Sequence, residues 1–283
     1  MKKQILLSAA AIIAVISLFF LGKTSEKKTI PPVAPAAEPT VFDISRYIES
    51  GKSSLSGEKH KMADSLSGLL ELTEGSKKSL IMNQLADFWR DSANNMLIFS
   101  YYVSEAAKLD NSVKNLNFAA QYSTSLLRSE GEQSRAEWLA NNALDLYDRA
   151  LKLEPANDDL KIGQGSVYIF RQNKNGSPES TMKGIMQILE VARKDSNNMK
   201  AQLMLGIGGF VSGQYDKAEK RLLKVTEKDP GNLEAAAFLA DTYAAQGKNE
   251  EAIKWYEVSK RLANDPGYSE EADERIRMLR NKR

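Results

Sequence analysis

The sequence predicts an all-α fold: a solenoid of helix-turn-helix units, preceded by an N-terminal transmembrane helix. The first observation is internal repetition, because LGIGGFVSGQYDKA starts at Leu205 and the similar LADTYAAQGKNEEA starts at Leu239, 34 residues later. The second is that apolar residues recur at every third or fourth position on both sides of each turn, as in amphipathic helices. The third is an uncharged apolar run from Ile5 to Leu21, close to the length that spans a bilayer.

The four glycines of the first segment do not form a nucleotide-binding loop. In the pattern GxGxxG, Val211 stands where the third glycine is needed, and no Gly-Lys-Ser/Thr sequence follows. The preceding residues are typical of a helix and not of a strand. Glycine inside a helix costs about 1 kcal/mol relative to alanine. We therefore expect the glycines inside the helices to mark close contacts between helices, and Gly213 to lie in the turn.

Each unit consists of a helix, a turn, a second helix and a stop. The second helices YDKAEKRLLKVTEKDP and NEEAIKWYEVSKRLANDP are amphipathic, and prolines end them at Pro230 and Pro266. Aligning the two segments superimposes small residues on small residues: Gly206 on Ala240, Gly213 on Gly247 and Ala218 on Ala252.

These units resemble the tetratricopeptide repeat, whose small, aromatic and proline positions occur in the same order. The best units are 199–232 and 233–266, and looser units with longer turns extend the predicted array to 76–266. Helices are expected at 42–75, and a polar helix that caps the array at 267–283. The positions that carry the pattern are Ala143, Tyr147, Pro155, Gly165, Gly184, Gly206, Gly213, Ala218, Pro230, Ala240, Tyr243, Gly247, Ala252 and Tyr256.

The resemblance implies a binding groove lined by the first helix of each unit, at positions spaced 3, 4, 3 and 1 apart. The predicted groove residues are Ile162, Ser166, Ile169, Phe170, Leu203, Ile207, Phe210, Val211 and Asp241. The groove is expected to be apolar in its middle and acidic toward the last unit. Because Gly209 stands where the family has an aromatic core residue, Phe210 has two alternatives, facing the groove or filling that space. The occupant is another protein, a second copy, or residues 41–74 of this chain.

Composition argues against several classes of function. Lys and Arg number 39 against 37 Asp and Glu, so a charge surplus does not favour nucleic acid as a partner. The sequence has no cysteine and a single histidine, His60, which is surrounded by charged residues on a predicted surface helix. Known hydrolase, metalloprotease and calcium-binding patterns do not occur. We therefore predict that the chain is not an enzyme and holds no cofactor or metal.

The N-terminal region predicts attachment to a membrane. Residues 1–22 favour an uncleaved signal anchor, because the small residues that a cleavage site needs are weakly represented after the apolar run. Residues 23–41 form a linker rich in proline and alanine. Lysines flank the run on both sides and leave the orientation open. The signal-like layout favours an inner-membrane protein with a single span and a periplasmic helical domain.

The leading hypothesis is a non-catalytic, membrane-tethered scaffold that binds partner proteins or peptides in the groove of the repeat array. One alternative is a structural envelope protein that assembles with itself, as a homo-oligomer. Another follows from similarity to membrane-anchored repeat proteins of bacterial envelopes, some of which are assembly chaperones in cytochrome c maturation.

The predicted topology can be tested with protease. Protease added to intact spheroplasts should digest the repeat array, because an array in the periplasm is accessible once the outer membrane has been breached. The measurement is an immunoblot for an epitope in the array, with a cytoplasmic protein as control. An array that is cleaved only after detergent opens the inner membrane would place it in the cytoplasm.

Overall fold

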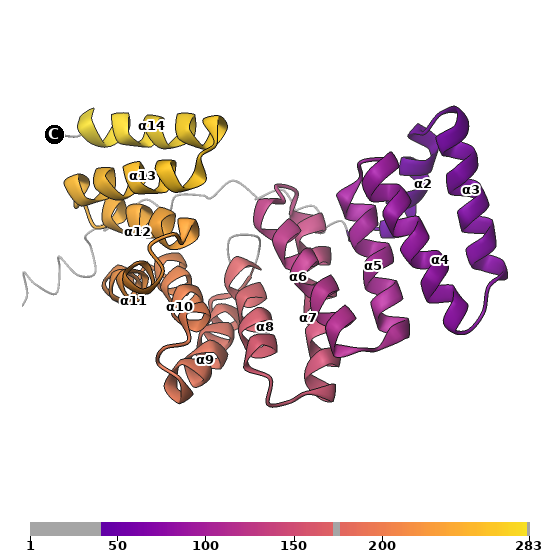
Figure 1. Ribbon diagram of the computed structural model, residues 1–283, viewed down its shortest axis with the longest axis horizontal. Helices are drawn as coiled ribbons and strands as arrows, with labels where there is room; N and C mark the ends of the chain where they lie inside the picture. Colours follow the sequence, from indigo (N-terminus) through magenta and orange to yellow (C-terminus); the bar gives the residue numbers. More distant parts are fainter. Residues whose placement is uncertain (1–40, 172–175, 282–283) are drawn as a thin grey trace, which may run out of the picture. The chain divides into compact units, whose positions relative to one another are not determined.

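The computed structural model describes residues 41–171 and 176–281, which fold into helices with no strand among them (Figure 1). The described residues belong to one compact unit, Val41–Arg283. The predicted anchor 1–22, and the predicted linker 23–41 apart from Val41, lie outside the described residues. Over the described ranges, no helix combines the length and the apolar character that crossing a membrane requires.

The helices follow one another along the chain with short connections, and helix α4 continues directly into a π-helical turn, η1. Their bounds are α2 Ile44–Ser54, α3 Gly57–Leu72, α4 Ser76–Asp87, η1 Phe88–Ser92, α5 Met96–Asp110, α6 Val113–Ser129, α7 Gln133–Leu153, α8 Asp158–Arg171, α9 Pro178–Lys194, α10 Met199–Val211, α11 Tyr215–Lys228, α12 Leu233–Ala245, α13 Asn249–Ala263 and α14 Pro266–Asn281.

Successive helices pack in pairs, α4 with α5, α6 with α7, α8 with α9, α10 with α11 and α12 with α13 (Figure 1). Each second helix also packs against the first helix of the next pair. The first helices α6, α8, α10 and α12 contact one another in turn, so they share one face of the array. Helix α14 packs on α13, and α2 and α3 pack against α5 and α4. The segment 41–74 therefore contributes its helices to the first unit of the array.

A repeated cap sets where several first helices begin. The side-chain oxygen of Asn157 accepts a hydrogen bond from the backbone of Leu160 at 3.2 Å. Asn198 and Asn232 accept equivalent bonds from residues three further on, both at 2.9 Å. An asparagine at this position satisfies a backbone N–H that the first turn of a helix leaves without a partner. The same short sequence signal therefore starts α8, α10 and α12.

The turns inside the two best units need glycine. Gly213 and Gly247 have φ of +73° and +74°, a left-handed conformation that side chains disfavour.

The two prolines that were expected to end the second helices differ in their roles. Pro230 follows the end of α11, whereas α13 ends at Ala263 before Asn264, and Pro266 is the first residue of α14. Proline suits that position because its missing N–H would have no partner there in any case.

Small residues lie where paired helices come closest. A Cβ added to Gly184 would lie 2.5 Å from the backbone oxygen of Gly165, so α8 and α9 touch through their backbones. A Cβ on Gly206 would lie 2.7 Å from Leu222 of α11. The expectation that glycines inside the helices mark close helix contacts is confirmed at Gly206, and Gly184 makes a contact of the same kind.

The core consists of three clusters along the array. The first runs from Ile48 to Val167 and contains the large, fully buried side chains Trp89 and Tyr147. Burial raises the pKa of Tyr147 to about 12. The second cluster joins α8, α9 and α10, and the third joins α11 to α14. Because each cluster is closed by the neighbouring pair of helices, the stability of one unit depends on the next.

A test of the close approach is the substitution Gly184→Ala. The added methyl group would meet the backbone of α8, which cannot move aside locally, so we expect the free energy of unfolding to fall by about 1–3 kcal/mol. The matched control is Gly68→Ala in α3, where a Cβ has no atom within 4 Å. That change should raise stability by up to about 1 kcal/mol. Unfolding in urea, followed by circular dichroism, measures both, and an unchanged Gly184→Ala midpoint would contradict the backbone contact.

Candidate partner-binding surface

The first helices α8, α10 and α12 carry partly buried apolar side chains where the core clusters meet. We call these residues the apolar strip: Phe170, Leu203, Phe210, Val211 and Phe238. Leu203 and Phe238 pack against both the second and the third cluster, and Phe170 packs against the first and the second. The strip thus presents apolar surface along the joints between units.

Four of the predicted groove residues are core residues in this structure. Ile162, Ser166, Ile169 and Ile207 are 2, 6, 0 and 0 % exposed, respectively. The physical reason is that neighbouring first helices lie close together: the Ile169 side chain would come within 3.1 Å of a Cβ on Gly208. On the same face Phe170, Leu203, Phe210 and Val211 remain partly exposed, and their role in binding stays a prediction.

The structure distinguishes between the two alternatives for Phe210. A Cβ on Gly209 would already lie 3.2 Å from the backbone nitrogen of Ala218, so the helices α10 and α11 leave no gap there. The Phe210 ring instead lies against Phe238 of α12, with ring centroids 5.7 Å apart, and against Tyr215 at 5.9 Å. Phe210 is therefore part of the apolar strip and keeps some exposure.

One residue beside the strip was not predicted from the sequence. The guanidinium of Arg128, in the last turn of α6, lies 4.6 Å from the ring centroid of Phe170. The same group forms an ion pair with Glu234 of α12, 106 residues away in the chain. The two side chains are 41 and 30 % exposed. Periodicity within a unit contains no signal for a contact between helices so far apart in the sequence.

Asp241 lies at the end of the array in a small polar group. Its carboxylate accepts a hydrogen bond from the hydroxyl of Tyr256 at 2.5 Å and pairs with Arg275 of the capping helix at 2.8 Å. Burial, with the hydrogen bond to Asp241, raises the pKa of Tyr256. These groups border a pocket of about 90 Å³ together with Tyr268. The acidic character expected at this end is therefore offset by Arg275.

A larger pocket, of about 270 Å³, lies between α4, α5 and α6. The π-helical turn η1 places Arg90 in its wall, where the guanidinium pairs with Asp87 at 2.9 Å and Asp91 at 2.7 Å. The same group lies 5.3 Å from the ring centroid of Phe99. Phe118 of α6, also in the wall, is 54 % exposed. The pocket thus lies between two successive first helices, with the intervening second helix behind it.

Comparison with known proteins identifies the repeat. Residues 211–270 match the family model of the tetratricopeptide repeat. The helical array has the fold of tetratricopeptide repeat proteins. The fold is shared with a thermophilic tetratricopeptide repeat protein of Thermus thermophilus, at 16% identity over 71% of this chain and 98% of that one, with a TM-score of 0.54. A tetratricopeptide repeat protein from Parabacteroides merdae is 17% identical over 84% and 91%, with a TM-score of 0.52. None of the curated proteins matches this sequence.

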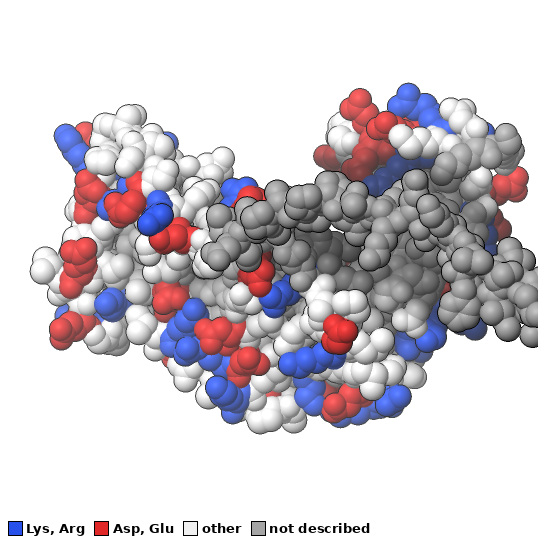
Figure 2. Space-filling view, turned by 180° about the vertical axis from the view of Figure 1, so that it is seen from behind, with Lys and Arg blue, Asp and Glu red and all other residues white. Residues whose placement is uncertain are grey.

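The surface of the tetratricopeptide array mixes charges of both signs. Figure 2 shows Lys and Arg interspersed with Asp and Glu over the visible face.

His60 lies half-exposed in α3, with one ring nitrogen 2.9 Å from the Lys52 carbonyl oxygen and the other 3.2 Å from Asp64. In the part of the chain that the structure describes, no three His, Cys, Asp or Glu residues are grouped so that they could hold a metal ion. The fold itself suggests a scaffold for protein–protein interaction.

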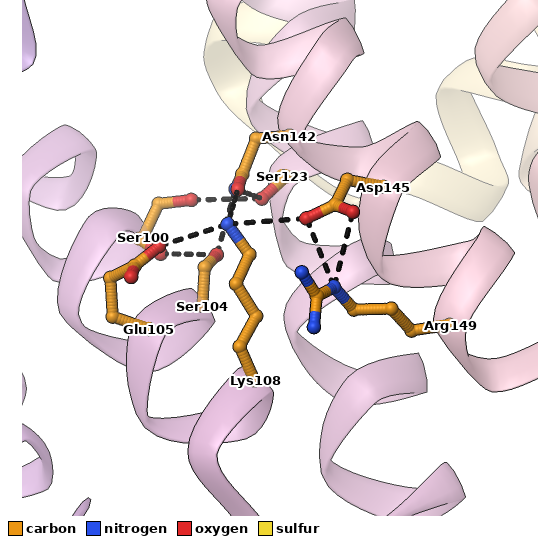
Figure 3. Close-up of polar contacts among 8 residues, drawn as sticks. All are labelled: Ser100, Ser104, Glu105, Lys108, Ser123, Asn142, Asp145 and Arg149. Atoms are coloured by element: carbon orange, nitrogen blue, oxygen red, sulfur yellow. Dashed lines mark hydrogen bonds and ion pairs between the residues drawn. The ribbon is translucent and has the colours of Figure 1, made fainter. Parts of the chain in front are cut away.

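A network of polar side chains lies inside the array, between α5, α6 and α7 (Figure 3). The side-chain nitrogen of Asn142 donates to the hydroxyls of Ser104 at 2.7 Å and Ser123 at 3.1 Å. Ser123 also shares a hydrogen bond with Ser100 at 3.0 Å. The three serines are at most 1 % exposed, so no substrate can reach their hydroxyls. They are structural residues and not nucleophiles.

Lys108 connects this network to the surface (Figure 3). Its ammonium group donates to the side-chain oxygen of Asn142 at 3.2 Å and to Glu105 at 2.9 Å. Asp145 lies 3.4 Å away and pairs in turn with Arg149 at 3.1 Å. Buried polar groups stabilise a fold when each finds a partner and destabilise it when one is left without. The network therefore specifies how these three helices pack.

The network gives a stability prediction for Asn142→Ala. The change removes the donor to two buried hydroxyls and an acceptor for Lys108, so the free energy of unfolding should fall by about 1–3 kcal/mol. The neighbouring Asn141 is exposed on the same helix. Asn141→Ala should change stability by no more than about 0.5 kcal/mol. Thermal unfolding measures the pair, and equal effects of the two substitutions would show that the network does not stabilise the array.

Proposed function

We propose that this protein is a non-catalytic scaffold, tethered to the inner membrane, that binds partner proteins through the apolar strip on its first helices. One observation carries the proposal. The positions that close the joints between units, such as Ile169 and Ile207, are fully buried, yet Phe170, Phe210 and Phe238 remain partly exposed beside them. Packing of the array does not need these rings to be exposed. Aromatic side chains that retain exposure on one face are typical anchors for a partner.

Two further features support binding over catalysis. The Phe210 and Phe238 rings meet edge to face and are fixed by the helices that carry them. A preformed surface of this kind loses little conformational freedom when a partner binds. The charges beside it are neutralised in pairs, as at Arg128 and Glu234 or Asp241 and Arg275. Acid–base catalysis usually needs one ionisable group with a shifted pKa. A surface whose charges form ion pairs can bind a partner without such a group.

The membrane tether and the periplasmic location of the array are part of the proposal and rest on the sequence. Residues 1–22 have the length and composition of a single span, and residues 23–41 have the composition of an extended linker. An array attached in this way stays near the bilayer, so the effective concentration of partners at the membrane is raised.

The test is capture of crosslinked partners by the full-length protein. A Phe170→Ala, Phe210→Ala double variant should recover partners at least about tenfold less efficiently, because anchor side chains at the centre of an interface carry most of the binding energy. The matched control is Met182→Ala, Met186→Ala, which removes two apolar side chains that are 47 and 51 % exposed on α9, a second helix. Circular dichroism confirms that both variants are folded.

The partner list distinguishes the alternatives. Partners that both variants retain equally would contradict binding through the apolar strip. Recovery of only the protein itself, with larger assemblies at higher concentration in sedimentation, would favour a self-assembling envelope protein. Recovery of an apocytochrome, lost in the strip variant, would identify the narrower role in cytochrome c maturation.

A further inference from the structure

We infer that Arg128 is a receptor for an acidic side chain on a helix of the bound partner, and that Glu234 of the chain itself occupies this receptor in the free protein. The inference rests on the proposed function, since it names the chemistry of the partner that lies on the apolar strip. It assigns a specificity role to a residue that the repeat pattern did not identify.

The geometry prepares Arg128 to hold a carboxylate. Its guanidinium lies 4.6 Å from the ring centroid of Phe170, which belongs to the strip. A guanidinium over an aromatic ring is held there by cation–π attraction, and its several N–H groups can still donate to a carboxylate. In this structure a carboxylate oxygen of Glu234 accepts from one of these groups. The side chain of Arg128 is thus held at the edge of the apolar surface with its donors directed at an acid.

The pair differs from the other ion pairs beside the strip in the helices that it joins. Arg171 pairs with Glu137 of α7, and Lys200 pairs with Asp159 of α8, so each of these joins packed neighbours. Arg128 and Glu234 belong to α6 and α12, and α8 and α10 lie between these helices in the order of the array. The Arg128–Glu234 ion pair therefore does not belong to the interface between two neighbouring helices. Its loss would therefore leave the packing of each unit intact.

Glu234 can leave Arg128 at low cost. Both side chains retain exposure, 41 % for Arg128 and 30 % for Glu234, and exposed ion pairs contribute little net stability. Glu234 also lies in the first turn of α12, where the N-terminal end of a helix favours a negative charge. Its carboxylate therefore keeps a favourable environment after a competing acid has replaced it.

The chemistry of Glu234 indicates what would replace it. Glu234 and Phe238 lie one helical turn apart on α12, so this helix offers an acid to Arg128 and an aromatic ring to the strip. A partner helix with an acidic residue beside apolar residues would offer the same two groups. The partner helix would bind more favourably than Glu234 does, because it would also remove the exposed apolar surface of Phe170 and Phe210 from water. The occupant is therefore an acidic, amphipathic helix of another protein.

The experiment uses helical peptides selected from a random display library against the full-length, detergent-solubilised protein. We expect the selected peptides to contain Asp or Glu among apolar residues, and replacement of that acid by its amide should weaken binding at least about tenfold. Arg128→Gln should weaken the binding of the acidic peptides by a similar factor and leave the binding of their amide versions unchanged. Glu234→Gln should strengthen binding about two- to fivefold, because it removes the competing carboxylate.

Arg149→Gln is the matched control, since Arg149 is another exposed arginine, 42 % exposed, that pairs with Asp145 on α7. It changes the net charge equally and should leave peptide affinity unchanged. Fluorescence anisotropy measures the affinities, and circular dichroism checks the fold of each variant. Peptides are made with both a free and an amidated C-terminus, and dependence on the terminal carboxylate alone would overturn the assignment to a side chain.

The ways in which the inference can fail are distinguishable. Peptides whose binding is lost in the Phe170→Ala, Phe210→Ala variant but is the same in Arg128→Gln would overturn this inference and leave the proposed function standing. Peptides that bind equally to both variants, or a selection that yields no binder, would contradict the proposed function and this inference together. Equal affinity of the wild type and Glu234→Gln would show that Glu234 does not occupy the receptor.

Discussion

The rest of the structure depends on the close approach of paired helices at small residues. At Gly165 and Gly184 the backbones of α8 and α9 touch, and at Gly209 the backbone of α11 fills the space that a side chain would take. The first helices of neighbouring units also meet at a glycine, because the Ile169 side chain of α8 packs at Gly208 of α10. The apolar positions between them are enclosed as core, and the partly exposed side chains beside them become the available surface.

This constraint separates two kinds of apolar residue that have the same periodicity. Ile207 and Phe210 lie three residues apart on α10, yet Ile207 is fully buried while Phe210 borders the outside against Phe238. A partner can reach only the second kind. The surface proposed for binding is therefore narrower than the helical spacing suggests, and it is formed mainly by aromatic rings at the joints between units.

Polar interactions have two roles in the array. Inside it, Asn142 donates to buried hydroxyls and accepts from Lys108, whose partner carboxylates are partly exposed, and this network specifies how α5, α6 and α7 pack. On the first-helix face, Arg128 and Glu234 form a pair that is exposed and joins helices far apart in the array. The hydroxyls of the first set are enclosed, so leaving them without partners is costly. Both members of the second pair are partly exposed, and an exposed ion pair contributes little net stability.

The sequence by itself determined the helical repeat, its turns and its caps. Gly213, Gly247 and the asparagines at 157, 198 and 232 act through local backbone geometry, which a few neighbouring residues specify. The tertiary structure decided which of the predicted groove residues are enclosed, how Phe210 is placed, and that Arg128 meets Glu234. Those outcomes depend on distances between helices and on contacts across 106 residues, and periodicity along one helix does not encode them.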